Sequence, residues 1–233
     1  MIQLSDFDAV TFDFYGTIVN WEREILAFLE DWAGPALEGR SVSDLLELYD
    51  RLRQPIQHER PAWRYTEVLK QTLDQLALAL GCDLPTCVRD RFGDIASTHQ
   101  PFPDSVATIR ALRERGLRIG VLSNVDNEPF QRILNAIGLE FDVVATAERV
   151  GAYKPDLAHF NAALADLRAL GIEKDRVLHV AQSRFADIVP ANRLGLSCVW
   201  VDRPGHVFGR SSGGAETATP TMTVPDLASV LHL

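Results

Sequence analysis

The sequence has few cysteines and no pattern that would join them. Its three cysteines are Cys82, Cys87 and Cys198. An odd number without metal-ligand spacing argues against a disulfide framework, and one close pair cannot complete a four-ligand zinc site. We therefore expect three reduced thiols in a cytoplasmic protein.

The sequence also lacks an excess of positive charge and a long apolar run. Lys plus Arg number 23 and Asp plus Glu number 32, which gives a formal net charge of −9. An acidic surface repels a phosphate backbone, so we expect no nucleic-acid partner. No apolar run approaches the roughly 20 residues that cross a bilayer, and the N-terminus has no basic and apolar leader, so we expect no membrane partner. A small anionic substrate remains possible if cations are placed locally.

What the sequence does have is an ordinary globular composition, 46% hydrophobic, and five short apolar runs rich in β-branched residues. Such runs are typical of strands covered on both faces of a parallel sheet. Between the later runs, apolar stripes with helical spacing lead to Gly116, Gly138 and Gly171, where helices would end. The alternation predicts an α/β fold with a doubly wound parallel sheet. The predicted strands are residues 9–12, 118–122, 141–145, 177–181 and 197–201.

About a hundred residues separate the first two runs, which is too many for one connecting loop. Three amphipathic stripes in this interval, at residues 25–32, 42–49 and 65–76, predict helices. We therefore predict a core domain of residues 1–19 and 100–233, and a helical cap domain of residues 20–99. We expect residues 204–222, rich in Gly, Ser, Thr and Pro, to form a loop. The cap helices leave a homodimer possible.

Polar residues follow the carboxyl ends of the predicted strands, where open parallel sheets bind their ligands. Because the topology brings distant segments to this edge, their convergence predicts an active site. The candidates are Asp13, Tyr15, Gly16, Thr17, Ser123, Asn124, Lys154, Gln182, Ser183 and Asp187.

A carboxylate at a strand end can act as a nucleophile, and Asp13 is so placed. Gly16 allows a sharp turn, so we expect its N–H to approach a ligand. Lys154 could keep Asp13 ionised, and Asp187 could serve as a base or a metal ligand. Each residue alone also fits turn or helix-start chemistry, but the set together predicts catalysis.

The order of these motifs resembles that of the haloacid dehalogenase superfamily, over essentially the whole chain. The matching segments are Phe-Asp-Phe-Tyr-Gly-Thr at 12–17, Leu-Ser-Asn at 122–124, Ala-Tyr-Lys-Pro-Asp at 152–156 and an acidic motif ending at Asp187. Tyr15 stands where most phosphatases of the superfamily carry a second Asp, and this form is similar to the L-2-haloacid dehalogenase (type II) branch. The resemblance implies a Rossmann-like core with a cap. It also implies Asp13 as nucleophile, Thr17, Ser123, Asn124 and Lys154 as its support, and Asp187 as the fourth-motif acid.

The resemblance further implies that an arginine of the cap helps to bind the leaving halide. Arg53 is our candidate, with Arg51, Arg60 and Arg64 left open. The chain departs from the family at Ala181-Gln182, where many members have Gly-Asp, so one usual magnesium carboxylate is missing. Arg184 and Phe185 also differ from the small polar residues of the branch.

These features favour displacement at carbon over phosphoryl transfer. A halide leaves as a stable anion, whereas a phosphatase needs charge neutralisation, usually by Mg²⁺, and a proton for the leaving group. We therefore expect a hydrolase of short 2-haloalkanoic acids that needs no metal or cofactor. The alternatives are a phosphatase with a weakened magnesium site and a non-catalytic binding protein.

In the expected reaction Asp13 attacks C2 to form an ester, and water activated by Asp187 then hydrolyses it. Lys154, Ser123 and backbone N–H groups near Tyr15 and Gly16 would hold the substrate carboxylate. We expect Tyr15, Thr17, Arg53, Asn124, Gln182 and Ser183 to contribute to substrate binding. Trp21, Trp63 and Phe185 could keep water out of the pocket.

Overall fold

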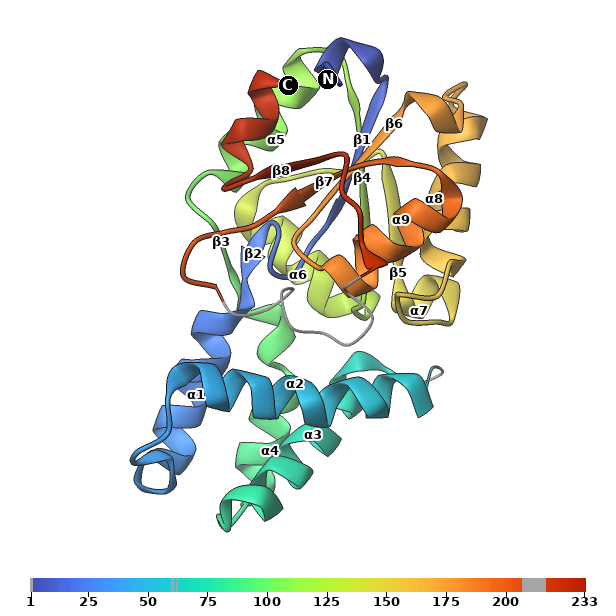
Figure 1. The fold of residues 1–233 in the computed structure, drawn as a ribbon. Coiled ribbons are helices and arrows are strands. Elements are labelled where there is room, and N and C mark those ends of the chain that lie inside the picture. Colours follow the sequence, from blue (N-terminus) through green and yellow to red (C-terminus); the bar gives the residue numbers. More distant parts are fainter. Residues whose placement is uncertain (1, 60, 62, 207–216) are drawn as a thin grey trace.

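The computed structural model describes residues 2–59, 61, 63–206 and 217–233. At its centre lies a six-stranded sheet in the order β5-β4-β1-β6-β7-β8, with every neighbouring pair parallel (Figure 1). This arrangement confirms the predicted α/β fold with a doubly wound parallel sheet. The strands are β1 (Ala9–Asp13), β4 (Arg118–Ser123), β5 (Val143–Thr146), β6 (Val177–Ala181), β7 (Ser197–Val201) and β8 (Met222–Val224).

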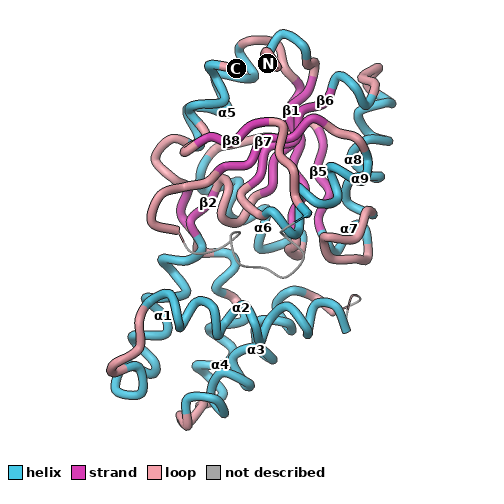
Figure 2. The backbone as a smooth tube through the Cα atoms, in the orientation of Figure 1, coloured by secondary structure: helices cyan, strands magenta, loops and turns pink. Residues whose placement is uncertain are grey.

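Two apolar clusters cover the sheet because the strands are apolar on both sides. Val10 and Phe12 of β1 belong to a cluster with helices α5 (Ser105–Glu114) and α6 (Asn127–Ile137). Ala9 belongs to a second cluster with α8 (Ala158–Ala169) and α9 (Val189–Leu194). A short helix, α7 (Ala147–Val150), follows β5. The sheet with these helices forms the upper part of Figure 2.

The other α-helices lie together past one edge of the sheet, beyond the carboxyl ends of its strands (Figures 1 and 2). They are α1 (Trp21–Ala33), α2 (Val42–Glu59), α3 (Tyr65–Leu80) and α4 (Thr86–Gly93). The chain leaves the core in β2 (Val19–Asn20) and returns in β3 (Gln100–Pro101), and these two strands pair antiparallel. The inserted helices are therefore attached at two adjacent points.

Three details differ from the sequence-based expectations. Helix α4 was not predicted because only Phe92 and Gly93 of its eight residues are buried, so it carries no apolar stripe. Strand β5 begins at Val143, because the Asp142 carboxylate accepts a hydrogen bond from the Ile119 N–H at 2.9 Å. The predicted loop ends in an edge strand, β8, which the turn-rich composition before it obscured. Residues 207–216 of that predicted loop lie outside the described residues.

Within the described residues, no helix combines the length and the apolar character that crossing a bilayer requires.

Candidate active site

Asp13 ends the central strand β1, and its carboxylate is held by two side chains from other parts of the chain. The Thr17 hydroxyl donates to Oδ2 at 2.7 Å, and the Lys154 ammonium donates to Oδ1 at 2.9 Å. The residue is only 6% exposed. Burial raises the pKa of Asp13 above its ordinary value, although the positive charge of Lys154 opposes that effect. The carboxylate is therefore poorly hydrated, which favours it as a nucleophile.

Lys154 lies at the centre of the site and uses all its donors. Its Nζ donates to Asp13 Oδ1, to the Leu122 carbonyl at 2.8 Å and to Asp187 Oδ1 at 2.6 Å. Burial alone would lower its pKa, but the two carboxylates outweigh that effect and raise it. Because an ammonium has three N–H groups, none is left for the predicted contact with a substrate carboxylate. In this geometry Lys154 holds the two acids together.

Asn124 explains why Lys154 sits where it does. Its side-chain amide donates to the Lys154 carbonyl at 3.1 Å and accepts from the Lys154 N–H at 2.7 Å. The loop after β4 therefore clamps the backbone of the lysine, as the convergence of strand ends suggested.

Asp187 lies in a π-helical turn, Arg184–Ile188, which the Ser183 hydroxyl caps by accepting from the Ala186 N–H at 3.0 Å. Oδ1 of Asp187 accepts from Lys154 and pairs with His179 Nε2 at 3.3 Å. Its Oδ2 has no hydrogen-bond partner within the described chain. Burial raises the pKa of Asp187, but Lys154 and His179 outweigh burial and hold the pKa below its ordinary value. An ionised carboxylate with one unpartnered oxygen suits a general base.

The sequence analysis missed His179, which is fully buried on β6. Its Nδ1 lies 3.0 Å from the Thr11 hydroxyl, so the ring connects β1 to Asp187. A histidine within a run of apolar residues was the signal that could have found it.

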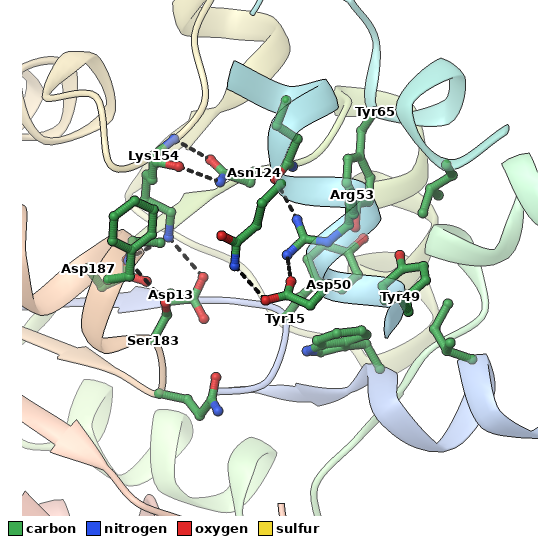
Figure 3. Close-up of a pocket in the computed structure, with 18 of the residues that line it drawn as sticks. Asp13, Tyr15, Tyr49, Asp50, Arg53, Tyr65, Asn124, Lys154, Ser183 and Asp187 are labelled. Atoms are coloured by element: carbon green, nitrogen blue, oxygen red, sulfur yellow. Dashed lines mark hydrogen bonds and ion pairs between the residues drawn. The ribbon is translucent and has the colours of Figure 1, made fainter. Parts of the chain in front are cut away.

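These acids open onto a cavity of about 100 Å³ between the sheet edge and the inserted helices (Figure 3). Of the predicted site residues, Asp13, Tyr15, Arg53, Asn124, Lys154, Gln182, Ser183 and Asp187 line it. The cavity exceeds several times the roughly 10–15 Å³ that one water molecule needs, so it suits a substrate of a few heavy atoms.

Thr17 and Ser123 lie behind this wall and are fully buried. Thr17 both donates to Asp13 and accepts from the Gln182 N–H at 2.9 Å. Ser123 Oγ has no hydrogen-bond partner among the described residues. Thr17 thus supports the Asp13 carboxylate from behind. Ser123 is buried behind the wall, and its contact with a substrate stays a prediction.

Two expectations about the pocket were wrong. The Gly16 N–H donates to the Val19 carbonyl at 2.8 Å, because the positive φ of 95° at Gly16 closes a tight turn, so it does not face a ligand. Trp63 is 40% exposed and is not among the residues that line the cavity, whereas Trp21 and Phe185 line it.

Helix α2 supplies the polar part of the opposite wall. Among the cap arginines that the structure describes, Arg53 lines the cavity, and it forms an ion pair with Asp50. Arg51 is exposed, and Arg64 forms an exposed ion pair with Glu148. Arg60 lies outside the described residues. The sequence analysis missed Asp50, Gln54 and Gln57, whose spacing with Arg53 places them on one face of the helix.

A core residue fixes the start of helix α3, which has no side-chain cap of its own. The Asp126 carboxylate accepts from the N–H groups of Tyr65 and Thr66 at 2.9 and 3.1 Å, and from the Thr66 hydroxyl at 3.1 Å. Asp126 follows the second motif in sequence, so the core caps a helix of the insert. Tyr65, at the first turn of α3, lines the cavity.

The donor set does not fit a magnesium ion. Mg²⁺ needs several oxygen ligands around it, but the Lys154 ammonium already occupies the space between Asp13 and Asp187. Gln182 offers an uncharged amide. Among the described residues, no group of three or more His, Cys, Asp or Glu side chains is placed to bind a metal.

Comparison with known proteins places this arrangement in a family. The chain is 29% identical over 237 residues to haloacetate dehalogenase H-2 of Moraxella sp. (strain B), covering 97% of each. It is 29% identical over 234 residues to an (S)-2-haloacid dehalogenase of Pseudomonas sp. (strain YL), covering 96% of this chain and 93% of that one. The L-2-haloacid dehalogenase structure from Xanthobacter autotrophicus shares the fold, with a TM-score of 0.79, 20% identity and coverage of 97% and 98%. The family model for haloacid dehalogenase-like hydrolases matches residues 7–195, and the chain belongs to this family.

Proposed function

We propose that this protein hydrolyses the carbon–halogen bond of short (S)-2-haloalkanoic acids to give 2-hydroxy acids. The observation that carries the proposal is the buried Lys154 ammonium, which donates hydrogen bonds to both Asp13 and Asp187 in the wall of a small cavity. This arrangement provides a nucleophile and a base without a metal. The names of the relatives, which include (S)-2-haloacid dehalogenases, support the same chemistry.

The reaction runs in two steps. A carboxylate oxygen of Asp13 attacks C2 of the substrate while the carbon–halogen bond breaks, and the halide leaves with the bonding electrons. The product is an ester between Asp13 and the substrate. Attack from the side opposite the halogen inverts the configuration at C2.

Water then hydrolyses the ester. Oδ2 of Asp187 accepts a proton from the water as the water oxygen attacks the Asp13 carbonyl carbon. The bond between that carbon and the substrate oxygen then breaks, the departing alkoxide takes the proton from Asp187, and the 2-hydroxy acid is released. The Asp13 carboxyl group loses its remaining proton to solvent. Lys154 holds both acids in place throughout. Because water attacks the protein carbonyl, C2 keeps its inverted configuration, so an (S)-2-haloacid gives an (R)-2-hydroxy acid.

Further proposals concern the protein as a whole. We propose that residues 20–99 act as a cap domain on a core of residues 1–19 and 100–233, supported by the β2–β3 pairing at the junction. A cytoplasmic location fits three free cysteines. A homodimer is supported by apolar side chains exposed on the cap helices, such as Leu78 at 85% and Val42 at 52%. Size-exclusion chromatography with light scattering tests this state.

A substrate screen tests the proposed activity. We expect halide release from (S)-2-chloropropionate that EDTA does not change, and no hydrolysis of phosphate esters when Mg²⁺ is added. Phosphate-ester hydrolysis that EDTA abolishes, beside inert haloacids, would establish the phosphatase instead. Inertness toward both classes would favour the binding protein.

A further inference from the structure

One face of helix α2 presents a row of polar side chains to the cavity. Asp50, Arg53, Gln54 and Gln57 follow one another at the i, i+3, i+4 and i+7 positions, and all four line the cavity. In Figure 3, Asp50 and Arg53 lie across the cavity from Asp13. Around them the wall is mostly aromatic or aliphatic, with Trp21, Ile25, Tyr49 and Leu69. A polar row in such surroundings needs hydrogen-bond partners.

The row forms a chain of hydrogen bonds that leaves two buried donors, Arg53 Nε and Gln57 Nε2, without a partner in the described part of the chain. Gln54 Nε2 donates to Asp50 Oδ2 at 2.5 Å, and the Arg53 guanidinium donates to Asp50 Oδ1. Arg53 also donates to Gln57 Oε1 at 2.5 Å. Because a guanidinium only donates hydrogen bonds, its partner on the Gln57 amide must be the oxygen, Oε1. The amide nitrogen Nε2 then has no acceptor in the described part of the chain.

The position of this donor points to a ligand. Gln57 is 5% exposed, and an unsatisfied buried donor costs folding stability. A purely structural ion pair between Asp50 and Arg53 would not require Gln57, a residue of the cavity wall, to keep its amide nitrogen unpaired. An acceptor atom on a bound molecule would complete the chain.

The charges of the row define what kind of acceptor fits. Asp50 and Arg53 are 14% and 15% exposed and cancel each other, so the row carries no net charge. A second carboxylate on the substrate would meet Asp50 and find no uncompensated cation in the row. A neutral oxygen, such as an ether, hydroxyl or amide oxygen, would accept from Gln57 without that repulsion.

We propose that Gln57 is a specificity-determining residue that binds a neutral oxygen on the C2 substituent of the substrate, and that Asp50 disfavours substrates with a second carboxylate. This proposal rests on the proposed dehalogenase function. It narrows the substrate class to 2-haloacids whose side chain carries an uncharged hydrogen-bond acceptor.

Two substrates of nearly equal size test the role of Gln57. 2-Chloro-3-methoxypropionate differs from 2-chlorovalerate by an oxygen in place of one methylene group. We expect kcat/KM to be about tenfold higher for the ether, the effect of one hydrogen bond. In Gln57→Leu the preference should vanish, so the ratio of the two kcat/KM values should fall to about one. Gln131→Leu, at an exposed position on α6, should keep the preference.

Two variants test the charge argument. Gln57→Glu retains the acceptor for Arg53 but removes the donor, so it should also lose the preference for the ether. Asp50→Asn frees the charge of Arg53, so kcat/KM for 2-chlorosuccinate should rise about tenfold relative to 2-chlorovalerate. If Asp50→Asn leaves that ratio unchanged, the charge argument is wrong.

Binding of unreactive analogues separates this proposal from the proposed function. The fluorescence of Trp21, which lines the cavity, can report binding of 3-methoxypropionate, valerate and succinate. Calorimetry should confirm each dissociation constant. Tighter binding of the ether that disappears in Gln57→Leu supports the subsite even if no haloacid reacts. Dehalogenation without any preference for the ether, or no measurable binding of it, overturns the subsite.

Discussion

The two walls of the cavity are built in different ways. The core wall draws Asp13, Asn124, Lys154 and Asp187 from four distant segments and holds them through buried contacts across the sheet edge. The polar part of the cap wall comes from a single helix, and its side chains contact one another at helical spacing. The core wall therefore depends on the whole topology, whereas this part of the cap wall depends on local spacing.

This difference separates reactivity from selectivity. Moving any member of the core wall requires a shift of strands, because the atoms around Lys154 are packed in a buried site. A substitution on α2 changes one side chain on a helix that persists without it. We therefore expect core variants to lose the reaction and cap variants to change its rate or preference.

The largest effect should come from Asp13→Asn. An amide cannot form the ester, so kcat should fall by at least about 10⁴-fold while the fold is kept. In the parent enzyme, a single turnover in ¹⁸O-labelled water should place the label in Asp13, as mass spectrometry of its peptide would show. Label found in the product alone would contradict the ester. Asp8→Asn, in an exposed ion pair with Arg176, is the matched control and should keep normal rates.

A smaller loss should follow from removing the arginine of the cap wall. If Arg53 donates to the leaving halide, Arg53→Ala should lower kcat/KM by roughly ten- to a hundredfold, the value of one charge-assisted hydrogen bond. Arg51→Ala, two residues away and exposed, should leave it unchanged. Equal effects of the two variants would count against the assignment.

Removing the contact between the two walls should have a smaller effect on the reaction. Asp126→Ala removes the cap of helix α3, and we expect the free energy of unfolding to fall by about 1 kcal/mol in urea titrations. The KM should rise as Tyr65 loses its fixed position. Asp94→Ala changes an exposed residue at a helix start without a side-chain cap and should change neither. An unchanged KM in Asp126→Ala would show that the cap wall holds its own position.

The smallest expected effect is the dependence of kcat/KM on pH. The pKa of Asp13 is raised, so kcat/KM should fall on the acid side with a midpoint above the ordinary value of 3.8. A carboxyl group whose pKa is higher in the folded than in the unfolded protein lowers the stability of the fold as it ionises. Protonating Asp13 in this pH range therefore does not unfold the protein. The pKa of Asp187 is lowered, so the stability that its ionised form gives the fold is lost only at a pH below that range. As the pH is lowered from 8 to 4, kcat/KM should therefore fall while the melting temperature is kept. A parallel fall of both quantities would contradict this prediction.

The sequence predicted the core wall better than the cap wall, for a physical reason. Strand ends in a parallel sheet converge, so Asp13, Lys154 and Asp187 could be assigned to one edge without knowing a single distance. Which residues of α2 line the cavity depends on how the helix is oriented, and the sequence pattern of the helix does not predict that orientation. Arg53 was assigned only through the family resemblance, and Asp50 and Gln57 not at all.

The order of the sheet has a consequence for synthesis on the ribosome. β1 is made first, yet both neighbours of its Ala9 lie far along the chain, at Arg118 and Val177. At about 5–20 residues per second, an apolar central strand waits roughly 10–30 seconds before its second partner has been translated. The nascent chain thus leaves a fully buried strand unpaired for this time, and expression yield should respond to chaperones and to translation speed between these strands.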